Sequence, residues 1–397
     1  MTTAARIRFN PFDAGFRRDP YPLYHRLRDA DPVHRALGMW VLTRHADVRE
    51  VLRDRTFSAG LIPAQVERRV DPGARIVRLG RASLVFTDNP EHARLRGLVN
   101  RAFTGVAELR PVVEGITDGL LDAGPVGDAV ADLADPLPVR VLGAWMALPA
   151  DVAGRVAAWT HDIRFLLEPG LMKGDDVERV TRVLDEFVLA LEPVITDRRR
   201  RPGDDLISRL AAARTGGGDR LTDEEVAFVA IMSFVAGHET TTSLIGNALL
   251  ALLRHPAQAD LLRERPELAG AAVRETLRHD SPLQMTKRLA TRDGTIGGRT
   301  VAAGEVILLC LGAANRDPAV FADPDAFDIT RDTTGHVALG DGLHGCLGGQ
   351  LAQLQAQVVL ERLASRPFRL RDEPLQWQTH SQIVRGLTRL PVTWGSV

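Results

Sequence analysis

The sequence predicts a mainly α protein with small β-sheets, a fold of the α+β class. Helical periodicity covers most of the chain, short strand-like runs gather in a few places, and one long apolar helical pattern spans residues 222–254. The 397 residues are 45% hydrophobic and carry a net charge of −1, which is typical of a globular protein with an ample core.

The predicted elements follow one another without a linker or an internal repeat, so we predict a single domain over residues 1–397. Residues 58–85 show no regular pattern. β-Rich segments are expected at about 30–45, 284–312 and 380–397, and the remainder is helical. Helical patterns cover roughly 90–121, 150–166, 176–200, 204–213, 223–254, 257–264 and 267–279, and another begins near Cys346.

The composition argues against several classes of protein. Without a charge excess, neither a nucleic-acid partner nor a membrane surface is expected. No apolar run reaches the length of a bilayer span, and the N-terminus lacks a signal-peptide core. Two cysteines cannot build a disulfide framework, so we expect a cytoplasmic protein.

Cys346 is the most informative residue, because glycines surround it at positions 340, 342, 345 and 348. Glycines let the backbone bend and let a flat, bulky group approach the sulfur. A thiolate is a good metal ligand, and a haem fits this description. Residues 340–345 also match a dinucleotide-binding pattern, but the acidic candidate Glu361 lies in a helical pattern rather than after a second strand.

The long helix carries a polar interruption in its middle. Thr222 and Glu225 form a capping-box pattern at its start. Its apolar faces predict a buried helix, yet Gly237, Glu239 and Thr240 lie at its centre. One interpretation is a tolerated kink with threonines bonding back to the helix. The other is a local opening beside a ligand, where an acid and a hydroxyl relay protons.

Two further pairs share a helix face by their spacing. Glu275 and Arg278 are three residues apart, and His92 and Arg96 are four apart. Each pair is compatible with an ordinary surface helix. The second pair would become a binding site if it met the carboxylates of a flat ligand.

These pieces occur together and in order, and with them the chain resembles a soluble bacterial cytochrome P450. The resemblance covers nearly the whole length. It is carried by the segments DPYPLYHRLR, WVLTRHADVREVL, NPEHARLR, AGHETT, ETLR, RLATRD, ANRDPAVFADPDAFDITR, GLHGCLGGQLA and VRGLTRLPVTW.

The resemblance implies a P450 fold with a long central helix over a haem b, and it implies O2 as co-substrate. Cys346 then ligates the iron, and Glu239 and Thr240 help to deliver protons. Glu275 and Arg278 form a structural pair, joined by Arg316 or Arg331. The other implied cofactor contacts are His92, Arg96, Ala236, Gly237, Arg288, Leu339, Gly340, Gly342, His344 and Gly348.

Three positions depart from the family pattern. Leu339 stands where the family usually has phenylalanine, so the seating or the potential of the haem is expected to differ. Gln353 replaces a common arginine and Gln355 a common acid, both on the helix beneath the face where electron donors dock.

The implied activity is a haem-thiolate monooxygenase that hydroxylates a secondary-metabolite intermediate. Epoxidation or oxidative coupling is an alternative within the family, and a non-catalytic haem sensor is an alternative of another class. Because the chain has no evident electron-supplying domain, electrons are expected from a separate ferredoxin and its NAD(P)H reductase. A monomer is expected.

The family topology also implies an apolar substrate pocket. Arg68, Arg69, Arg75, Arg78 and Arg81 near its entrance suggest an acidic or carrier-protein-bound substrate, the alternative being a solvated loop. The expected lining residues are Leu61, Ile62, Phe165, Leu166, Leu171, Ile231, Phe234, Val235, Leu283, Met285, Ile383 and Val384.

Overall fold

Every strand of the described chain lies in the first of two structural units, whereas the second unit is helical. The structure is a computed structural model that describes residues 7–124, 126–366 and 368–394, without the side chains of 62–64 and 394. The first unit contains the residues up to Ser58, Ser243–Cys346 and those from Leu363 onward. The second contains Ala59–Thr242 and Leu347–Arg362. The predicted fold class is confirmed, and the single domain stays a prediction.

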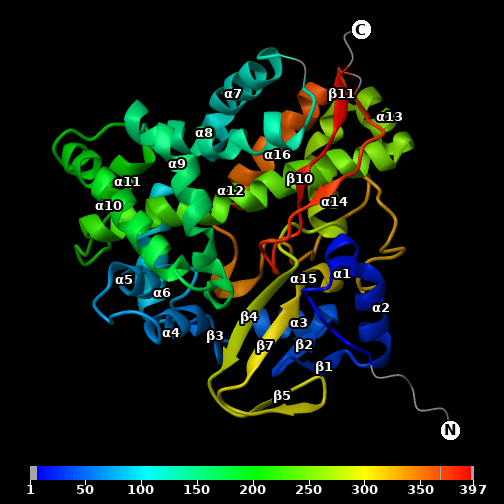
Figure 1. The fold of residues 1–397 in the computed structure, drawn as a ribbon, viewed down its shortest axis with the longest axis horizontal. Helices are drawn as coiled ribbons and strands as arrows, with labels where there is room; N and C mark the ends of the chain where they lie inside the picture. The colour runs from blue at the N-terminus through cyan, green and yellow to red at the C-terminus, as the bar shows by residue number, and fades with distance from the viewer. Residues whose placement is uncertain (1–6, 125, 367, 395–397) are drawn as a thin grey trace. The chain divides into compact units, whose positions relative to one another are not determined.

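A five-stranded mixed sheet forms the centre of the first unit, with the strand order β1-β2-β7-β4-β3. The β2–β7 pair is parallel, whereas the β1–β2, β4–β7 and β3–β4 pairs are antiparallel. Figure 1 shows β4 and β7 side by side. The strands are β1 (Val33–Ala36), β2 (Met39–Leu42), β3 (Phe57–Ser58), β4 (Met285–Ala290) and β7 (Val306–Cys310).

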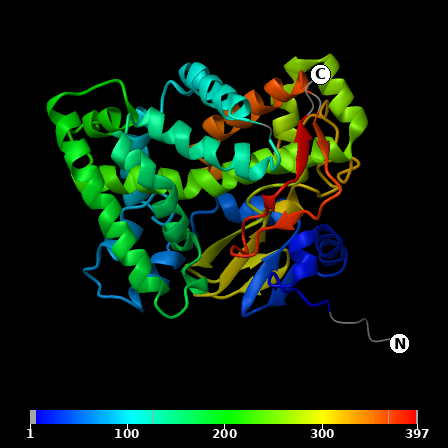
Figure 2. The same cartoon turned by 45° about the horizontal axis from the view of Figure 1, so that its top comes forward.

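Strict alternation along β7 places its side chains in two different cores. Ile307 and Leu309 pack on the face that α3 (His45–Arg53) covers, with Val48 and Val51. Leu308 and Cys310 pack on the opposite face, in the core to which α1 (Ala14–Arg18) and α2 (Tyr21–Ala30) contribute. Figures 1 and 2 show these two N-terminal helices beside the sheet. The apolar run VILLCLG predicts a core position for Cys310, and the structure confirms it.

The rest of the first unit consists of short strand pairs and helices. The pairs are β5 (Gly294–Ile296) with β6 (Arg299–Val301), β8 (Phe368–Leu370) with β11 (Val392–Trp394), and β9 (Gln376–Trp377) with β10 (Leu387–Arg389). The helices are α13 (Pro256–Glu264), α14 (Ala269–His279) and α15 (Leu311–Ala314).

The second unit is built around the N-terminal part of α12 (Asp223–Arg254), a helix of 32 residues that spans about 48 Å. Figure 1 shows it as the long helix of the fold. The capping box is confirmed, because the Glu225 N–H donates to Thr222 Oγ1 at 3.1 Å and the Thr222 N–H donates to Glu225 Oε2 at 2.7 Å. The other long helices are α6 (Glu91–Ala102), α7 (Arg110–Asp122), α8 (Pro136–Trp145), α9 (Ala150–Ile163), α10 (Asp176–Arg200), α11 (Leu206–Ala212) and α16 (Gly349–Ala364).

The sequence-based expectations missed five helices, of which α1 and α15 have only five and four residues. The segment 58–85, expected to be irregular, contains α4 (Leu61–Glu67) and α5 (Arg75–Arg81). Helix α8 was not predicted because Pro136 and Pro138 weaken its helical pattern. Both prolines lie in the first turn, where a backbone N–H has no partner within the helix, so they do not interrupt it. Among the described residues, no helix combines the length and apolarity needed to cross a membrane.

Candidate active site

Cys346 stands at the end of a closed glycine loop in the first unit. Gly340 and Gly342 both have a φ of +73°, a left-handed conformation that strains any residue with a side chain. The Cys346 N–H donates to the Leu339 carbonyl at 2.8 Å and closes the loop. Cys346 is exposed, whereas Cys310 is buried, and burial raises the pKa of the Cys310 thiol. Cys346 is therefore the thiol that a ligand can reach.

A carboxylate that the sequence did not single out holds this loop. Asp341 Oδ2 accepts hydrogen bonds from Arg49 Nε at 2.8 Å and from Arg53 Nε at 2.9 Å, both on α3. Its Oδ1 accepts from the Gly342 N–H at 2.8 Å. Nothing in the sequence links α3 to the loop, since about 290 residues separate them.

Two predicted haem contacts, Arg288 and His344, also lie in the first unit. His344 ends the short 3-10 helix Gly342–His344 within the cysteine loop itself. Arg288 is a buried residue of β4, and its guanidinium donates to the Lys287 carbonyl at 2.8 Å. The first unit therefore contains the thiol and two side chains that can donate hydrogen bonds to a carboxylate.

Glu275 and Arg278 on α14 form an ion pair with both side chains 0% exposed. Two hydrogen bonds of 2.8 Å join them, and Arg278 also donates to the carbonyls of Asn315, Pro324 and Ala326. Such complete pairing is what a buried charge requires. Arg331 Nε lies 3.5 Å from Glu275, whereas Arg316 is held by the His279 carbonyl and Asp325. The structure thus favours Arg331 as the third member of the group.

In the second unit, α12 remains helical through the predicted interruption, so the expected local opening is not present. The Thr240 hydroxyl donates to the Ala236 carbonyl at 2.7 Å, which matches the alternative of threonines bonding back to the helix. Gly237 lies against α8, since a Cβ there would meet Leu142 Cδ1 at 3.4 Å.

Glu239 has an ionic partner that the sequence did not indicate. Arg164, which follows α9, has its Nε 3.7 Å from Glu239 Oε1, and the two side chains are 13% and 25% exposed. Arg164 also stacks on Phe165 and donates to the His161 carbonyl. Burial lowers the pKa of Arg164, while Glu239 acts in the opposite direction. The carboxylate of the proposed acid–alcohol pair is therefore held from the end of α9.

The remaining polar candidates of the second unit lie on α6 and α12. His92 is fully buried and Arg96 is half-buried, one turn later on α6. On α12, His238 Nε2 lies 3.0 Å from both the carbonyl oxygen and a carboxylate oxygen of Asp135. It therefore faces the start of α8.

The predicted substrate-pocket residues do not share one environment. In the second unit, Leu166, Ile231, Phe234 and Val235 are buried, and the Phe234 ring lies 6.0 Å from that of Phe187 in the helical core. Leu61, Phe165 and Leu171 are half-buried, and the side chain of Ile62 is outside the described part of the chain.

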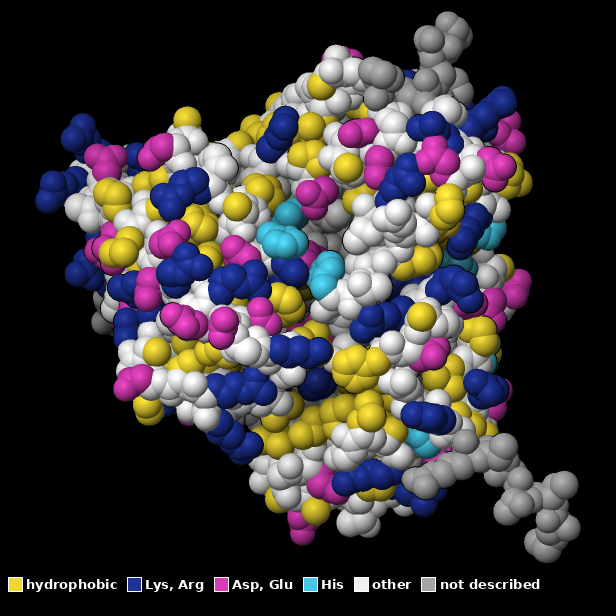
Figure 3. Space-filling view, viewed as in Figure 1, with side chains coloured by type: hydrophobic (Ala, Val, Ile, Leu, Met, Phe, Trp, Pro, Cys, Tyr) yellow, Lys and Arg dark blue, Asp and Glu magenta, His cyan; other side chains and the backbone are white. Residues whose placement is uncertain are grey.

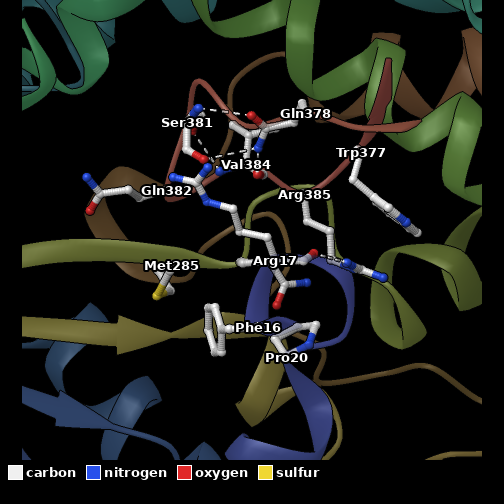
Figure 4. Close-up of a pocket in the computed structure, with 12 residues that line it drawn as sticks. Phe16, Arg17, Pro20, Met285, Trp377, Gln378, Ser381, Gln382, Val384 and Arg385 are labelled. Atoms are coloured by element: carbon white, nitrogen blue, oxygen red, sulfur yellow. Dashed lines mark hydrogen bonds between the residues drawn. The ribbon is translucent and has the colours of Figure 1, made fainter. Parts of the chain in front are cut away.

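In the first unit, Leu283 and Val384 form an isolated β-bridge, and Ile383 is half-buried. Met285 and Val384 line a small pocket with Phe16, Trp377 and Arg385 (Figure 4). The four predicted residues of this unit, Leu283, Met285, Ile383 and Val384, thus lie near one another. The pocket is also lined by residues that the sequence did not suggest.

The arginines expected near the pocket entrance are mostly engaged within the protein. Arg75 and Arg78 pair with Glu224, Arg75 also pairs with Asp185, and Arg81 pairs with Glu67. Arg69 donates to the carbonyls of Pro169 and Met172. Figure 3 shows acidic and basic side chains interspersed on one face of the molecule. This cluster therefore gives little support to an acidic substrate.

Comparisons with known proteins decide the family. A model of the family described as Cytochrome P450 matches residues 158–386. The Vitamin D(3) 25-hydroxylase of Pseudonocardia autotrophica is 39% identical over 409 residues, which cover 100% of this chain and 98% of that protein. This chain belongs to the cytochrome P450 family. As a P450 it is a monooxygenase, and the family uses haem iron, O2, a redox partner and a small-molecule substrate.

Solved P450 structures agree with this assignment. CalO2 matches with a TM-score of 0.91 and 37% identity, covering 98% of this chain and 99% of that one. P450BioI, in complex with hexadec-9Z-enoic acid ligated Acyl Carrier Protein, matches with a TM-score of 0.87 and 32% identity. That match covers 96% of this chain and 99% of P450BioI.

The residues of this P450 fit a haem. The accessible Cys346 thiol is a soft ligand on a loop whose backbone is fixed. In the same unit, Arg288 and His344 are a cationic and an imidazole side chain that can donate hydrogen bonds to carboxylates.

The three residues that depart from the family pattern lie on α16 and in the cysteine loop. Gln355 is buried in α16, and its amide donates to the Leu351 carbonyl at 3.3 Å. Gln353 is half-buried and bonds back to the Gly349 carbonyl. Leu339 is half-buried, and its carbonyl closes the cysteine loop.

Proposed function

We propose that this P450 hydroxylates an intermediate of secondary metabolism, and that the Cys346 thiolate would hold the iron of haem b. The observation that carries the proposal is the accessible Cys346 thiol in the closed glycine loop. When bound, the haem iron activates O2, with the thiolate favouring cleavage of the O–O bond. One oxygen atom enters a C–H bond of the substrate, and the other leaves as water after two electrons and two protons have been supplied.

Glu239 and Thr240 are the proposed source of those protons. The Thr240 hydroxyl donates to the Ala236 carbonyl, so its oxygen is held in one orientation and can accept a hydrogen bond. The Glu239 carboxylate is 25% exposed, so it can exchange protons with water. Arg164 Nε, 3.7 Å from Glu239 Oε1, holds that carboxylate in place. The pair would then pass a proton from solvent to the reacting oxygen.

Four side chains are proposed to hold the haem carboxylates. Arg288 and His344 would donate from the first unit, and His92 and Arg96 from the second. Charge-assisted hydrogen bonds to carboxylates are stronger than neutral ones, so these four would fix the orientation of the haem. The proposed close backbone contacts are Ala236, Gly237, Leu339, Gly340, Gly342 and Gly348.

The proposed substrate is predominantly apolar. Most of the predicted lining residues are aliphatic, and three of the five entrance arginines, Arg75, Arg78 and Arg81, pair with acidic residues of the same unit. The similar P450BioI binds an Acyl Carrier Protein ligated with hexadec-9Z-enoic acid. A carrier-bound substrate is therefore the second candidate. Epoxidation or oxidative coupling would use the same site.

We further propose a monomeric, cytoplasmic enzyme that receives electrons from a ferredoxin and its NAD(P)H reductase. The chain matches other P450s over nearly their full length, so the matched residues all belong to the P450 fold. None of them is left to form a reductase domain.

The deciding experiment is the absorbance spectrum of the reduced, CO-bound protein. A strongly red-shifted Soret band is expected, because a thiolate donates electron density to the iron. Its absence in folded, haem-loaded protein would overturn the assignment of Cys346. Substrate candidates are then screened by the spin shift they cause, followed by NAD(P)H consumption and product analysis with a surrogate ferredoxin system. NAD(P)H consumption that no tested compound stimulates would count against a hydroxylase.

A further inference from the structure

The cysteine loop is attached to α3 through a single carboxylate. Asp341 lies between the two positive-φ glycines, and its Oδ2 accepts from both Arg49 and Arg53, which are one turn apart on α3. The other oxygen, Oδ1, accepts from the Gly342 N–H. Both carboxylate oxygens therefore accept hydrogen bonds, one from α3 and the other from the loop backbone.

The backbones of the loop and α3 are also in close contact. A Cβ on Gly342 would lie 3.0 Å from the Leu52 carbonyl oxygen and 3.2 Å from Arg53 Cα. The Gly345 N–H donates to the Gly342 carbonyl, and the Cys346 N–H donates to the Leu339 carbonyl. The region around Asp341 and the region around the thiol are therefore one hydrogen-bonded loop, and a shift of Asp341 would be transmitted to Cys346.

The three charges reach solvent to different degrees. The side chain of Asp341 is 21% exposed, and those of Arg49 and Arg53 are 41% and 55% exposed. Burial raises the pKa of Asp341, but the hydrogen bonds from both arginines outweigh burial and keep that pKa below its ordinary value. A single exposed ion pair contributes little to stability. A carboxylate shared by two arginines and a backbone N–H forms a network, which contributes more. Salt would weaken such a network.

We propose that Asp341 is a positioning residue for Cys346, and that Arg49, Asp341 and Arg53 form a salt-sensitive clamp that keeps the thiolate in its geometry toward the haem iron. The inference rests on the proposed function, because it assumes that Cys346 is the iron ligand. The clamp acts on the loop and not on the substrate.

The test uses Asp341→Asn in the purified holoenzyme, with Glu305→Gln as the matched control. Glu305 is also a carboxylate of the first unit that accepts from an arginine, Arg35, and from a backbone N–H, but it directly precedes β7 and is not in the cysteine loop. The first readout is the rate at which the reduced CO complex loses its thiolate-type Soret band. The second is the rate of Cys346 alkylation, since Cys310 is buried.

We expect Asp341→Asn to raise both rates roughly 3- to 10-fold at low salt, the range that a small network of exposed charge pairs can supply. At about 1 M salt, where the screening length is about 3 Å, the wild type should approach the variant. Glu305→Gln should leave both rates at their wild-type values. The double change Arg49→Gln with Arg53→Gln should reproduce Asp341→Asn.

Equal rates for Asp341→Asn and the wild type, at both salt concentrations, would overturn the clamp. So would an effect of Glu305→Gln as large as that of Asp341→Asn, because the loss would then be one of general stability. If the wild type shows no thiolate-type band, the proposed function fails instead, and the alkylation rates alone decide whether Asp341 restrains the loop.

Discussion

The cysteine loop and the centre of α12 carry the two halves of the proposed chemistry, and they are held in different ways. In the loop, the backbone fixes Cys346 through a 2.8 Å hydrogen bond and two positive-φ glycines. In α12, side chains fix the polar groups: Thr240 bonds to Ala236, and Glu239 lies 3.7 Å from Arg164. The proposed metal ligand is thus placed by main-chain geometry, and the proposed proton donor by a looser ionic contact.

The difference follows from what each group must do. A ligand to iron needs one fixed position, which a closed loop supplies at the cost of left-handed backbone conformations. A proton-delivering carboxylate must exchange its proton and change partners, which a partly exposed ion pair permits. Loss of the Cys346 thiol should therefore abolish function, whereas substitutions around the centre of α12 should only lower the activity.

The largest effect is expected from Cys346→Ser. A neutral hydroxyl does not replace a thiolate as a ligand, so substrate oxidation should fall below detection and the red-shifted CO band should vanish. Absorbance spectroscopy and product analysis check this. Cys310→Ala, a change at the buried thiol, is the control and should retain the band. Retention of the band in Cys346→Ser would contradict the assignment.

The next effect is on stability and comes from the buried ion pair Glu275–Arg278. Glu275→Gln should lower the free energy of unfolding by about 3–5 kcal/mol, because Arg278 would be left as an uncompensated buried charge. Denaturant unfolding measures it. The exposed pair Arg265–Glu267 is the control, and Glu267→Gln should cost at most about 1 kcal/mol. Equal losses would show that Glu275 is not a buried anchor.

On the α12 side, Glu239→Gln should lower kcat about 100-fold, within the usual contribution of a positioned acid or base. Arg164→Gln should have a smaller effect, roughly 10-fold or less, because the carboxylate remains while its anchor is lost. Two measurements check both variants: the solvent isotope effect on kcat, and the amount of product formed per NAD(P)H oxidised. Arg155→Gln, at an exposed position of α9, is the control. A larger loss in Arg164→Gln than in Glu239→Gln would contradict this order.

Gly342→Ala tests how strictly the loop backbone is fixed. We expect a loss of about 2 kcal/mol in stability, from the left-handed conformation and from the close Leu52 carbonyl. Gly304→Ala is a matched control, since Gly304 has a φ of +84° but open space around its Cβ. Thermal unfolding of the two variants separates the two causes. If Gly304→Ala is equally destabilising, the contact with α3 contributes nothing.

The smallest effect is a pH dependence of the unfolding free energy, caused by His336, which precedes the cysteine loop in the sequence. Burial lowers the pKa of His336 to about 4, and His336 Nδ1 accepts the Ala338 N–H at 3.3 Å. Because the unfolded chain binds this proton more readily, the stabilisation is complete above about pH 6.5 and is lost as the pH falls toward 4. The loss should be roughly 1–2 kcal/mol after solvent screening. His336→Gln should flatten the unfolding free energy over this pH range, and an unchanged slope would contradict the assignment.

Many features were predictable from the sequence because local patterns encode them. The capping box of α12, the burial of Cys310 and the fold class all follow from short-range rules of periodicity and capping. Helix α8 and the short helices α4 and α5 were not predicted, since prolines and charged residues mask their periodicity. The glycine loop was recognised through its spacing, because four glycines within a few residues of one cysteine form an unusual local pattern.

The sequence by itself determined which residue types the chemistry requires: one cysteine among glycines, an acid–alcohol pair, and an acidic–basic pair on a helix. The tertiary structure alone decided their partners. It brought Asp341 to α3, Arg164 to Glu239 and Arg331 to Glu275, and it buried Phe234 and Gln355. The physical reason is that helical and loop patterns are local, whereas these ion pairs join segments many residues apart, whose proximity only the packed fold creates.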